Sequence, residues 1–182
     1  MWHLAGSNSE EICPGMASRS DIYRTGGAVA GRRRVRADWL VLAFVCVLAV
    51  VLRAAWFGNP NSDIDEQLYS LIGNQMLHGQ IPFVDLWDRK PIGLFLIFAG
   101  AHAIGGPGAI AFQIMGLVFA ILGAMLTYTI ARDLVDRMTA SGVAALYLML
   151  ISTYGSHSAQ TEIFHVPMML AMAVLVRDPN HA

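Results

Sequence analysis

Long apolar runs separated by short polar segments occupy most of this chain after residue 38. The first run, residues 39–57, is interrupted only by Arg53. At about 1.5 Å of rise per residue, a helix of this length crosses a hydrocarbon core of about 30 Å. Three later runs lie at residues 109–130, 138–154 and 163–176. The pattern predicts about four membrane-spanning helices.

Two further segments have a helical pattern but are unsuited to crossing a membrane. Residues 92–104 stop at a Gly-Gly-Pro-Gly break after about 20 Å of helix, which is too short to span the bilayer. We expect this helix to lie at the outer membrane interface, with one side facing lipid or protein. Residues 65–77 predict a short amphipathic helix that ends at His78-Gly79.

Residues 1–38 are polar and show neither the period of a strand nor that of a helix. We expect them to form a disordered cytoplasmic segment, with Met16 as an alternative start. Because basic residues precede the first apolar run, a secretory signal peptide is the competing interpretation of residues 39–57. The run is longer than a usual signal-peptide core and no clean cleavage site follows it, which favours a retained helix.

The composition supports a membrane protein. Hydrophobic residues make up 55% of the chain and charged residues 14%, whereas soluble domains carry about 25% charged residues. The balance of 12 basic and 13 acidic residues argues against binding to nucleic acid, and 2 cysteines do not make a disulfide scaffold. The expected fold class is an all-α integral membrane protein.

The arginines predict the orientation, because cytoplasmic loops are enriched in Arg and Lys. The arginine-rich stretch at 32–36 places the N-terminal segment inside and residues 58–108 outside. The basic loop at 132–137 then falls inside, and residues 155–162, which contain no basic residue, fall outside. This topology is consistent only if residues 92–104 do not cross.

The predicted outer segment is rich in carboxylates: Asp63, Asp65, Glu66, Asp85 and Asp88. A solvated loop is one explanation, since exposed loops are normally polar. Asp65 and Glu66 differ because they open the predicted helix at 65–77, where the helix dipole favours the ionised form. An ionised carboxylate at a membrane surface suits a general base or a ligand for a cation.

Few cations lie on the same side. Arg89 and Lys90 follow the acidic loop, Lys90 is the only lysine, and Arg53 lies near the end of the first run. A lipid phosphate at this depth requires such a cation, although we expect Arg53 to extend to the lipid headgroups instead. Glu162 is expected on the same side, either completing an acidic site with Asp65 or stabilising the start of the last helix.

The outer segment also carries an extended motif, Asp65-Glu66-x-x-Tyr69, then Met76-Leu77-x-Gly79-x-x-Pro82-x-x-Asp85-x-Trp87-Asp88-x-Lys90-Pro91. It resembles the first outer loop of lipid-phosphate-sugar-dependent glycosyltransferases of the GT-C superfamily. The nearest resemblance is to bacterial family 39, which includes protein mannosyltransferases and the aminoarabinose transferase of lipid A. The resemblance covers roughly residues 40–176. Two positions depart from it: Ile92 replaces the second proline of the "KPP" motif, and Glu162 stands where many relatives have Asp.

This resemblance implies an inverting transfer of a sugar from a polyprenyl-phosphate donor to an extracytoplasmic hydroxyl of a lipid, glycan or protein, in a bacterial inner membrane. It implies that Asp65 is the catalytic carboxylate and that Lys90 contacts the donor phosphate. Glu66 and Glu162 are expected to orient the sugar or to hold a divalent cation, for which Asp65 and Glu162 are the candidate ligands. The other expected substrate-binding residues are Arg89, Tyr69 and Asp85.

Members of that family have many more membrane helices, so we expect residues 39–182 to be a truncated N-terminal GT-C module whose outer catalytic loop is 58–108. The alternative is a small non-catalytic membrane protein, or a decayed fragment, that binds lipid phosphates. Membrane lipids are expected partners under both interpretations.

Overall fold

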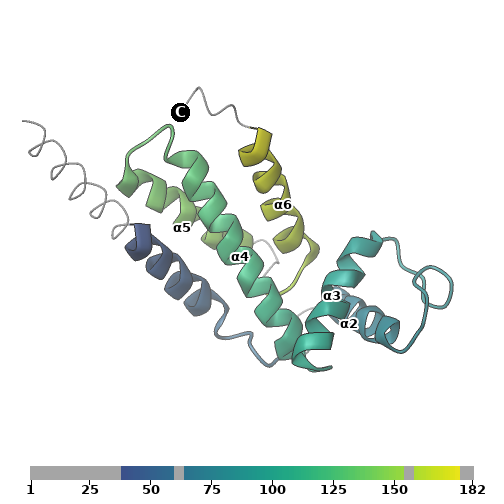
Figure 1. Ribbon diagram of the computed structural model, residues 1–182. Helices are drawn as coiled ribbons and strands as arrows, with labels where there is room; N and C mark the ends of the chain where they lie inside the picture. Colours follow the sequence, from purple (N-terminus) through teal and green to yellow (C-terminus); the bar gives the residue numbers. More distant parts are fainter. Residues whose placement is uncertain (1–37, 60–63, 154–157, 177–182) are drawn as a thin grey trace, which may run out of the picture. The chain divides into compact units, whose positions relative to one another are not determined.

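Apolar periodicity and glycine breaks divide the chain into helices (Figure 1). The computed structural model describes residues 38–59, 64–153 and 158–176. Every regular element in these ranges is an α-helix, and the only bridge of strand type joins Pro82 to Leu86. The all-α prediction is therefore confirmed for the described residues. The predicted disorder of the N-terminal segment falls on residues outside them.

Residues 38–53 are helical. The following helices are α2 (Ile64–Leu77), α3 (Ile92–Gly105), α4 (Ala109–Ala131), α5 (Arg137–Thr153) and α6 (Thr161–Val176). The predicted bounds of α2 to α6 are confirmed to within one or two residues. The predicted end of the first helix at residue 57 is wrong, because the helix stops at Arg53 and turns follow it. The side chain of Gln113 hydrogen-bonds the backbone of these turns at Trp56, Gly58 and Asn59, which replaces the helical pattern.

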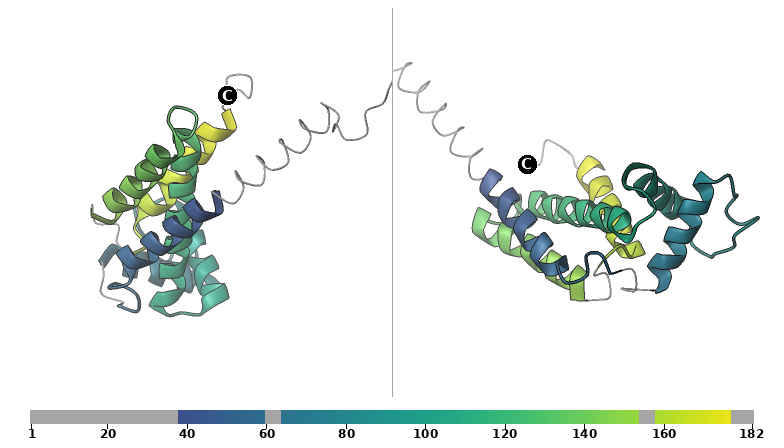
Figure 2. Two further views of the ribbon diagram at one scale, coloured as in Figure 1. Left: turned by 90° about the vertical axis from the view of Figure 1, so that its left-hand side faces the viewer. Right: turned by 90° about the horizontal axis from the view of Figure 1, so that it is seen from below.

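The chain divides into two units, residues 1–40 and residues 41–182. Of the first unit only residues 38–40 are described, and they are helical. In the second unit α5 and α6 both pack against α4, and α3 packs against α2 and α4. Figure 2 shows α4 between its neighbours from two further sides. The helix α4 is therefore the element that joins the rest of this unit.

The break between α3 and α4 follows from local chemistry. Gly106 has a positive φ of 81°, which glycine adopts without strain, and its N–H donates to the carbonyl of His102 at 2.9 Å. Pro107 then prevents the helix from continuing. The next break ends at Asp136, whose carboxylate accepts hydrogen bonds from the backbone N–H groups of Met138 and Thr139 and so caps α5.

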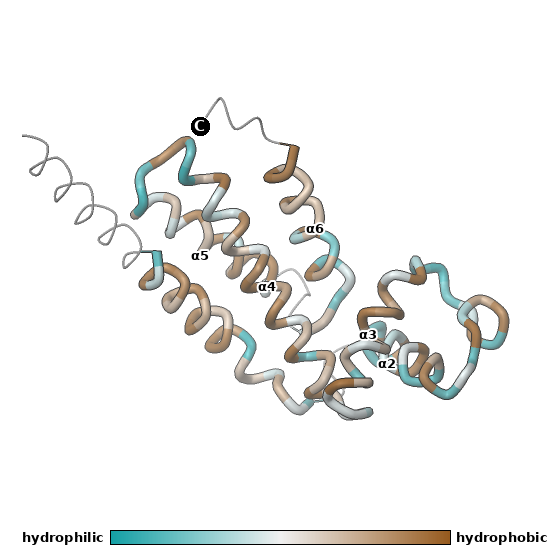
Figure 3. The backbone as a smooth tube through the Cα atoms, viewed as in Figure 1, coloured by the Kyte–Doolittle hydropathy of each residue, from teal (hydrophilic) through white to brown (hydrophobic). Residues whose placement is uncertain are grey.

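Among the described residues, α4 is the one helix whose length and composition suit a membrane crossing, while α3 and α6 are apolar but shorter. Figure 3 shows brown apolar stretches along α3, α4 and α6, and polar segments before α3 and between α4 and α5. The number of spanning helices stays a prediction. One side of α3 is expected to face either lipid or protein. The side that carries Phe95, Phe98 and His102 is buried against protein.

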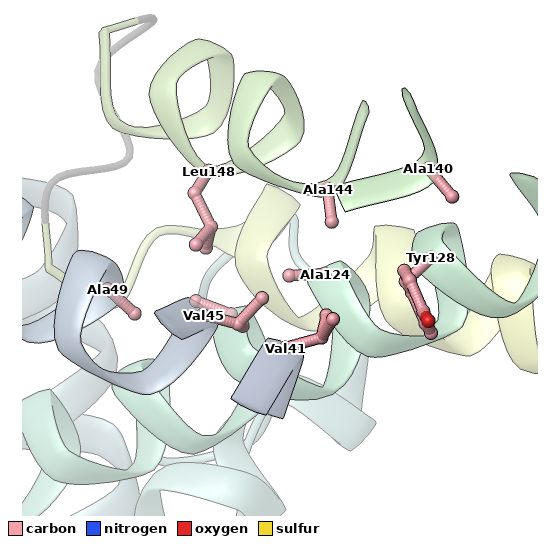
Figure 4. Close-up of a cluster of buried hydrophobic side chains, with 9 residues drawn as sticks. Val41, Val45, Ala49, Ala124, Tyr128, Ala140, Ala144 and Leu148 are labelled. Carbon is pink, nitrogen blue, oxygen red and sulfur yellow. The ribbon is translucent and has the colours of Figure 1, made fainter. Parts of the chain in front are cut away.

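Two clusters of buried side chains hold the described residues of the second unit together. The small-residue cluster joins the first helix, α4 and α5 (Figure 4) and consists of Val41, Val45, Ala49, Ala120, Ala124, Tyr128, Ala140, Ala144 and Leu148. The aromatic cluster joins α2, α3, α4 and α6 and consists of Tyr69, Ile72, Leu94, Phe95, Phe98, Ala101, Phe112, Ala159 and Phe164. Gly73 permits the close approach of α2 to α3, since a Cβ there would lie 2.7 Å from Cβ of Phe98.

Candidate functional site

Tyr69 is the centre of the candidate site. Only 1% of its surface is exposed, and its hydroxyl donates a hydrogen bond to Oδ2 of Asp65 at 3.3 Å. The two residues share a face of α2 because they are one helical turn apart. The Tyr69 ring packs against Phe98 in an edge-on arrangement, with centroids 5.8 Å apart, and against Phe95 at 6.3 Å. These contacts hold the hydroxyl at the edge of the aromatic cluster.

Lys90 approaches the same tyrosine from the segment before α3. Its Nζ lies 5.8 Å from the centroid of the Tyr69 ring, within cation–π range. The Lys90 backbone is held by its N–H, which donates to Oδ1 of Asp88 at 2.9 Å. The lysine is half-buried, whereas the neighbouring Arg89 is exposed. Arg89 and Lys90 are both predicted to bind substrate. Of these two adjacent cations, Lys90 is the one that lies beside Tyr69.

Burial raises the pKa of the Tyr69 hydroxyl, while the nearby side chains of Thr161 and Lys90 act to lower it. Asp65, Tyr69, Lys90 and Thr161 therefore converge from α2, the segment before α3 and the start of α6. We call these four residues the tyrosine cluster. The carboxylate of Asp65 remains exposed at its edge, so the cluster offers both a negative and a positive group to a ligand.

Glu66 lies next to Asp65 in the sequence but in a different environment. It is 1% exposed, and its Oε1 accepts a hydrogen bond from the backbone N–H of Ala159 at 2.7 Å. This contact ties α2 to the segment that leads into α6 and so places Thr161 near Tyr69. The structure gives Glu66 a positioning contact, and its predicted role toward the sugar stays a prediction.

In the described ranges, the side chains of Glu162 and Asp85 make no hydrogen bond or ion pair with the side chains of the tyrosine cluster. Glu162 is exposed in the first turn of α6 and makes no hydrogen bond or ion pair with Asp65 in the described ranges. Asp85 is exposed and accepts a hydrogen bond from the N–H of Ile81 at 2.7 Å, which braces the turn before α3. Asp63 lies outside the described residues.

A metal site is not assembled by the predicted ligands. Within residues 38–59, 64–153 and 158–176, no group of three or more His, Cys, Asp or Glu side chains is placed to hold a metal ion. Asp65 and Glu162 are not brought together by any contact in these ranges.

An apolar groove is lined by Pro91, the residue that follows Lys90 in the sequence, and by residues of α3 and α6. It has a volume of about 310 Å³ and runs between the start of α3 and α6. The lining residues are Pro91, Gly93, Leu94, Ile97, Phe164, His165 and Met168. Lys90 immediately precedes the first lining residue in the sequence, and the lining residues Leu94 and Phe164 also belong to the aromatic cluster that contains Tyr69.

Sequence reasoning missed the part played by Gln113. Its buried amide accepts from Gly58 N–H at 2.7 Å and donates to the carbonyls of Trp56 and Asn59 at 3.1 Å. The only signal available was a lone amide in an otherwise apolar run. The turns that it holds enclose Arg53, which is 2% exposed. The expectation that Arg53 extends to the headgroups is therefore wrong.

Comparison of the chain with protein-family models, with curated proteins and with solved structures finds no match. The site is consequently interpreted from its own residues and from the resemblance of its loop motif. Chemically, a carboxylate can accept a proton and an ammonium can neutralise a phosphate. Asp65 accepts a hydrogen bond from the Tyr69 hydroxyl, and the ammonium of Lys90 lies 5.8 Å from the centroid of the Tyr69 ring.

Proposed function

We propose that this chain acts in a membrane-embedded glycosyltransferase that moves a sugar from a polyprenyl-phosphate donor to an acceptor hydroxyl outside the cytoplasm. The observation that carries the proposal is the meeting of Asp65 and Lys90 at Tyr69, beside an apolar groove. We place the cluster at the outer face of a bacterial inner membrane. The helix at 38–53 together with α4, α5 and α6 then crosses the bilayer.

The donor would bind across the polar and apolar parts of the site. Its phosphate pairs with the ammonium of Lys90, because a charge-assisted contact in a partly buried place is stronger than one in water. Its prenyl chain follows the groove between α3 and α6, which is lined almost entirely by apolar side chains. This assignment is supported by the position of Lys90 immediately before the first lining residue, Pro91.

The reaction proposed is a single displacement. The carboxylate of Asp65 accepts the proton of the acceptor hydroxyl, and the acceptor oxygen attacks the anomeric carbon of the sugar. The bond from that carbon to the phosphate oxygen breaks, and the electron pair leaves with the phosphate, whose negative charge Lys90 balances. Attack opposite to the leaving group inverts the anomeric centre. Tyr69 donates to Asp65 and orients it, while Glu66 positions the start of α6 through Ala159.

The test is a transfer assay with the chain in lipid vesicles. Radiolabelled polyprenyl-phosphate mannose and polyprenyl-phosphate aminoarabinose serve as donors, and sugar leaving the donor is measured. We expect Asp65→Asn to lower turnover roughly 100- to 10,000-fold, the usual effect of losing a general base. Asp133→Asn, which changes an exposed acid in the turn after α4, serves as the matched control.

Equal turnover by Asp65→Asn and the parent chain would refute the catalytic role. Binding of polyprenyl phosphate that depends on Lys90, without transfer of either sugar, would instead favour the non-catalytic lipid-phosphate-binding protein.

A further inference from the structure

A second cavity, separate from the groove between α3 and α6, lies between α2 and the turn that leads into α4. Its volume is about 300 Å³, at the lower end of the usual range for small-molecule pockets. The lining residues are Gln67, Ser70, Leu71, Asn74, Pro107, Ala109 and Phe112. None of the residues of the tyrosine cluster is among them, so this cavity needs its own explanation.

One wall of the cavity is polar but uncharged. Gln67, Ser70 and Asn74 are spaced by three and four residues along α2 and therefore share one helix face. An amide side chain both donates and accepts hydrogen bonds, as does a hydroxyl. No lining residue is ionisable at neutral pH, and the side chain of Asn74 makes no hydrogen bond with the described residues. The wall thus suits a neutral ligand with several hydroxyl groups.

The opposite wall is apolar and includes Pro107 and Phe112. A sugar ring has this same division, with hydroxyl groups around its rim and C–H groups on its faces. The C–H face can pack on an aromatic or proline ring while the hydroxyls meet the amides. A charged ligand or a purely apolar one leaves one of the two walls unmatched.

A buried histidine holds the polar wall in place. Nε2 of His102 lies 2.9 Å from Oγ of Ser70, and Nδ1 lies 2.9 Å from the carbonyl oxygen of Gly106. Because a carbonyl only accepts, Nδ1 carries a proton, and in the neutral ring Nε2 then accepts the proton of Ser70. This leaves the lone pairs of the Ser70 oxygen available as hydrogen-bond acceptors. The ring of His102 also contacts the ring of Phe112 edge-on, with centroids 6.2 Å apart. His102 therefore contacts a residue of each wall.

We propose that this cavity binds a neutral carbohydrate ring, and that it receives the sugar-bearing acceptor of the transfer described above. The acceptor role rests on the proposed function, whereas the binding does not. Both sites draw on α2, which contributes Asp65 and Tyr69 to one and Ser70 and Asn74 to the other.

The experiment is ligand-observed saturation-transfer NMR on the full chain in detergent, with methyl α-glucopyranoside as the probe and cyclohexylmethanol as an apolar control of similar size. We expect the glucoside to bind and the alcohol to bind more weakly. Asn74→Leu and Ser70→Ala should each weaken glucoside binding roughly fivefold to tenfold, the effect of losing one hydrogen bond. Gln75→Leu changes an amide of the same helix that does not line the cavity and should leave binding unchanged.

Circular dichroism and the thermal midpoint identify a variant that fails to fold, in which case Asn74→Ala replaces Asn74→Leu. The proposal is overturned if the parent chain does not bind the glucoside, if both probes bind equally, or if folded Asn74 and Ser70 variants keep the parent affinity. Lys90→Ala should leave glucoside binding intact. If the parent chain binds the glucoside but transfers no sugar, only the proposed function is refuted, and if the parent chain transfers sugar without binding the glucoside, only this inference is refuted.

Discussion

The small-residue cluster and the aromatic cluster are built from different side chains. In the first, alanines at the contacts between the first helix, α4 and α5 let the helix backbones approach closely (Figure 4), as is common between helices in membranes. In the second, rings of α2, α3, α4 and α6 pack edge-on or tilted at 5.0 to 6.3 Å.

The polar side chains of the candidate site lie at only one of the two clusters. Glu66, His102 and the tyrosine cluster all lie within or at the edge of the aromatic cluster. Tyr128 is the one member of the small-residue cluster with a polar side chain, whereas the buried carboxylate of Glu66 contacts Ala159 and the imidazole of His102 contacts Phe112, both in the aromatic cluster. The small-residue cluster is thus interpreted as the scaffold and the aromatic cluster as the support of the site.

After the loss of turnover expected for Asp65→Asn, the next largest effect is expected at Lys90. Lys90→Ala should raise the donor KM roughly 10- to 100-fold, because a charge-assisted contact to phosphate is lost. Arg89→Ala removes an adjacent but exposed cation and should change KM little. Steady-state transfer kinetics with varied donor concentration measure both variants. An equal effect of the two would show that general positive charge, and not the position at Tyr69, matters.

A second way to test the comparison is to remove the buried carboxylate of the aromatic cluster. Glu66→Ala leaves the buried N–H of Ala159 without its acceptor, which should lower the free energy of unfolding by about 1.5–3 kcal/mol. Glu66→Gln keeps an oxygen in place and should lose less. Thermal midpoints in detergent separate the two. If both variants are equally unstable, the charge of Glu66 matters more than this hydrogen bond.

The stability of the small-residue cluster should depend on the size of its side chains instead. Ala124→Leu adds volume where no space remains, and overpacking of this kind costs about 1–3 kcal/mol. Leu122→Ala changes an exposed position on the same helix and provides the control. The folded fraction of Ala124→Leu should still bind polyprenyl phosphate with the parent affinity. Weaker binding by that fraction would mean that the two clusters are coupled.

The smallest expected effect is the contribution of Tyr69 to the pH dependence of stability. Its pKa is raised chiefly by burial, so the unfolded chain loses the phenol proton before the folded chain does. The contribution of this group to stability is fully present below about pH 10 and falls as the pH rises through the pKa of the folded state. Unfolding midpoints between pH 9 and pH 11 should fall less steeply for Tyr69→Phe than for the parent chain. Identical slopes would contradict the buried environment of Tyr69.

Much of the helical order could be predicted, because apolar runs and the glycine–proline breaks are local signals that fixed the bounds of α2 to α6 closely. The different environments of adjacent acidic residues could not be predicted from the sequence. Asp65 and Glu66 look alike in sequence, yet they point about 100° apart on a helix, so one is exposed and the other meets Ala159. The burial of Arg53 depends on the turns held by Gln113, more than fifty positions away, and no local pattern reports such a contact.

The most direct test of the central claim is to photo-crosslink a polyprenyl phosphate that carries a photoreactive group on its chain. The apolar groove near Lys90 can be compared with a second apolar groove of about 300 Å³, whose lining includes Ile130, Val143 and Leu170 and contains no charged residue. We predict labelling of residues 91–97 and 164–168, with loss of that labelling in Lys90→Ala. Equal labelling of both grooves, or labelling unchanged by Lys90→Ala, would contradict the assignment of Lys90 as the group that binds the donor phosphate.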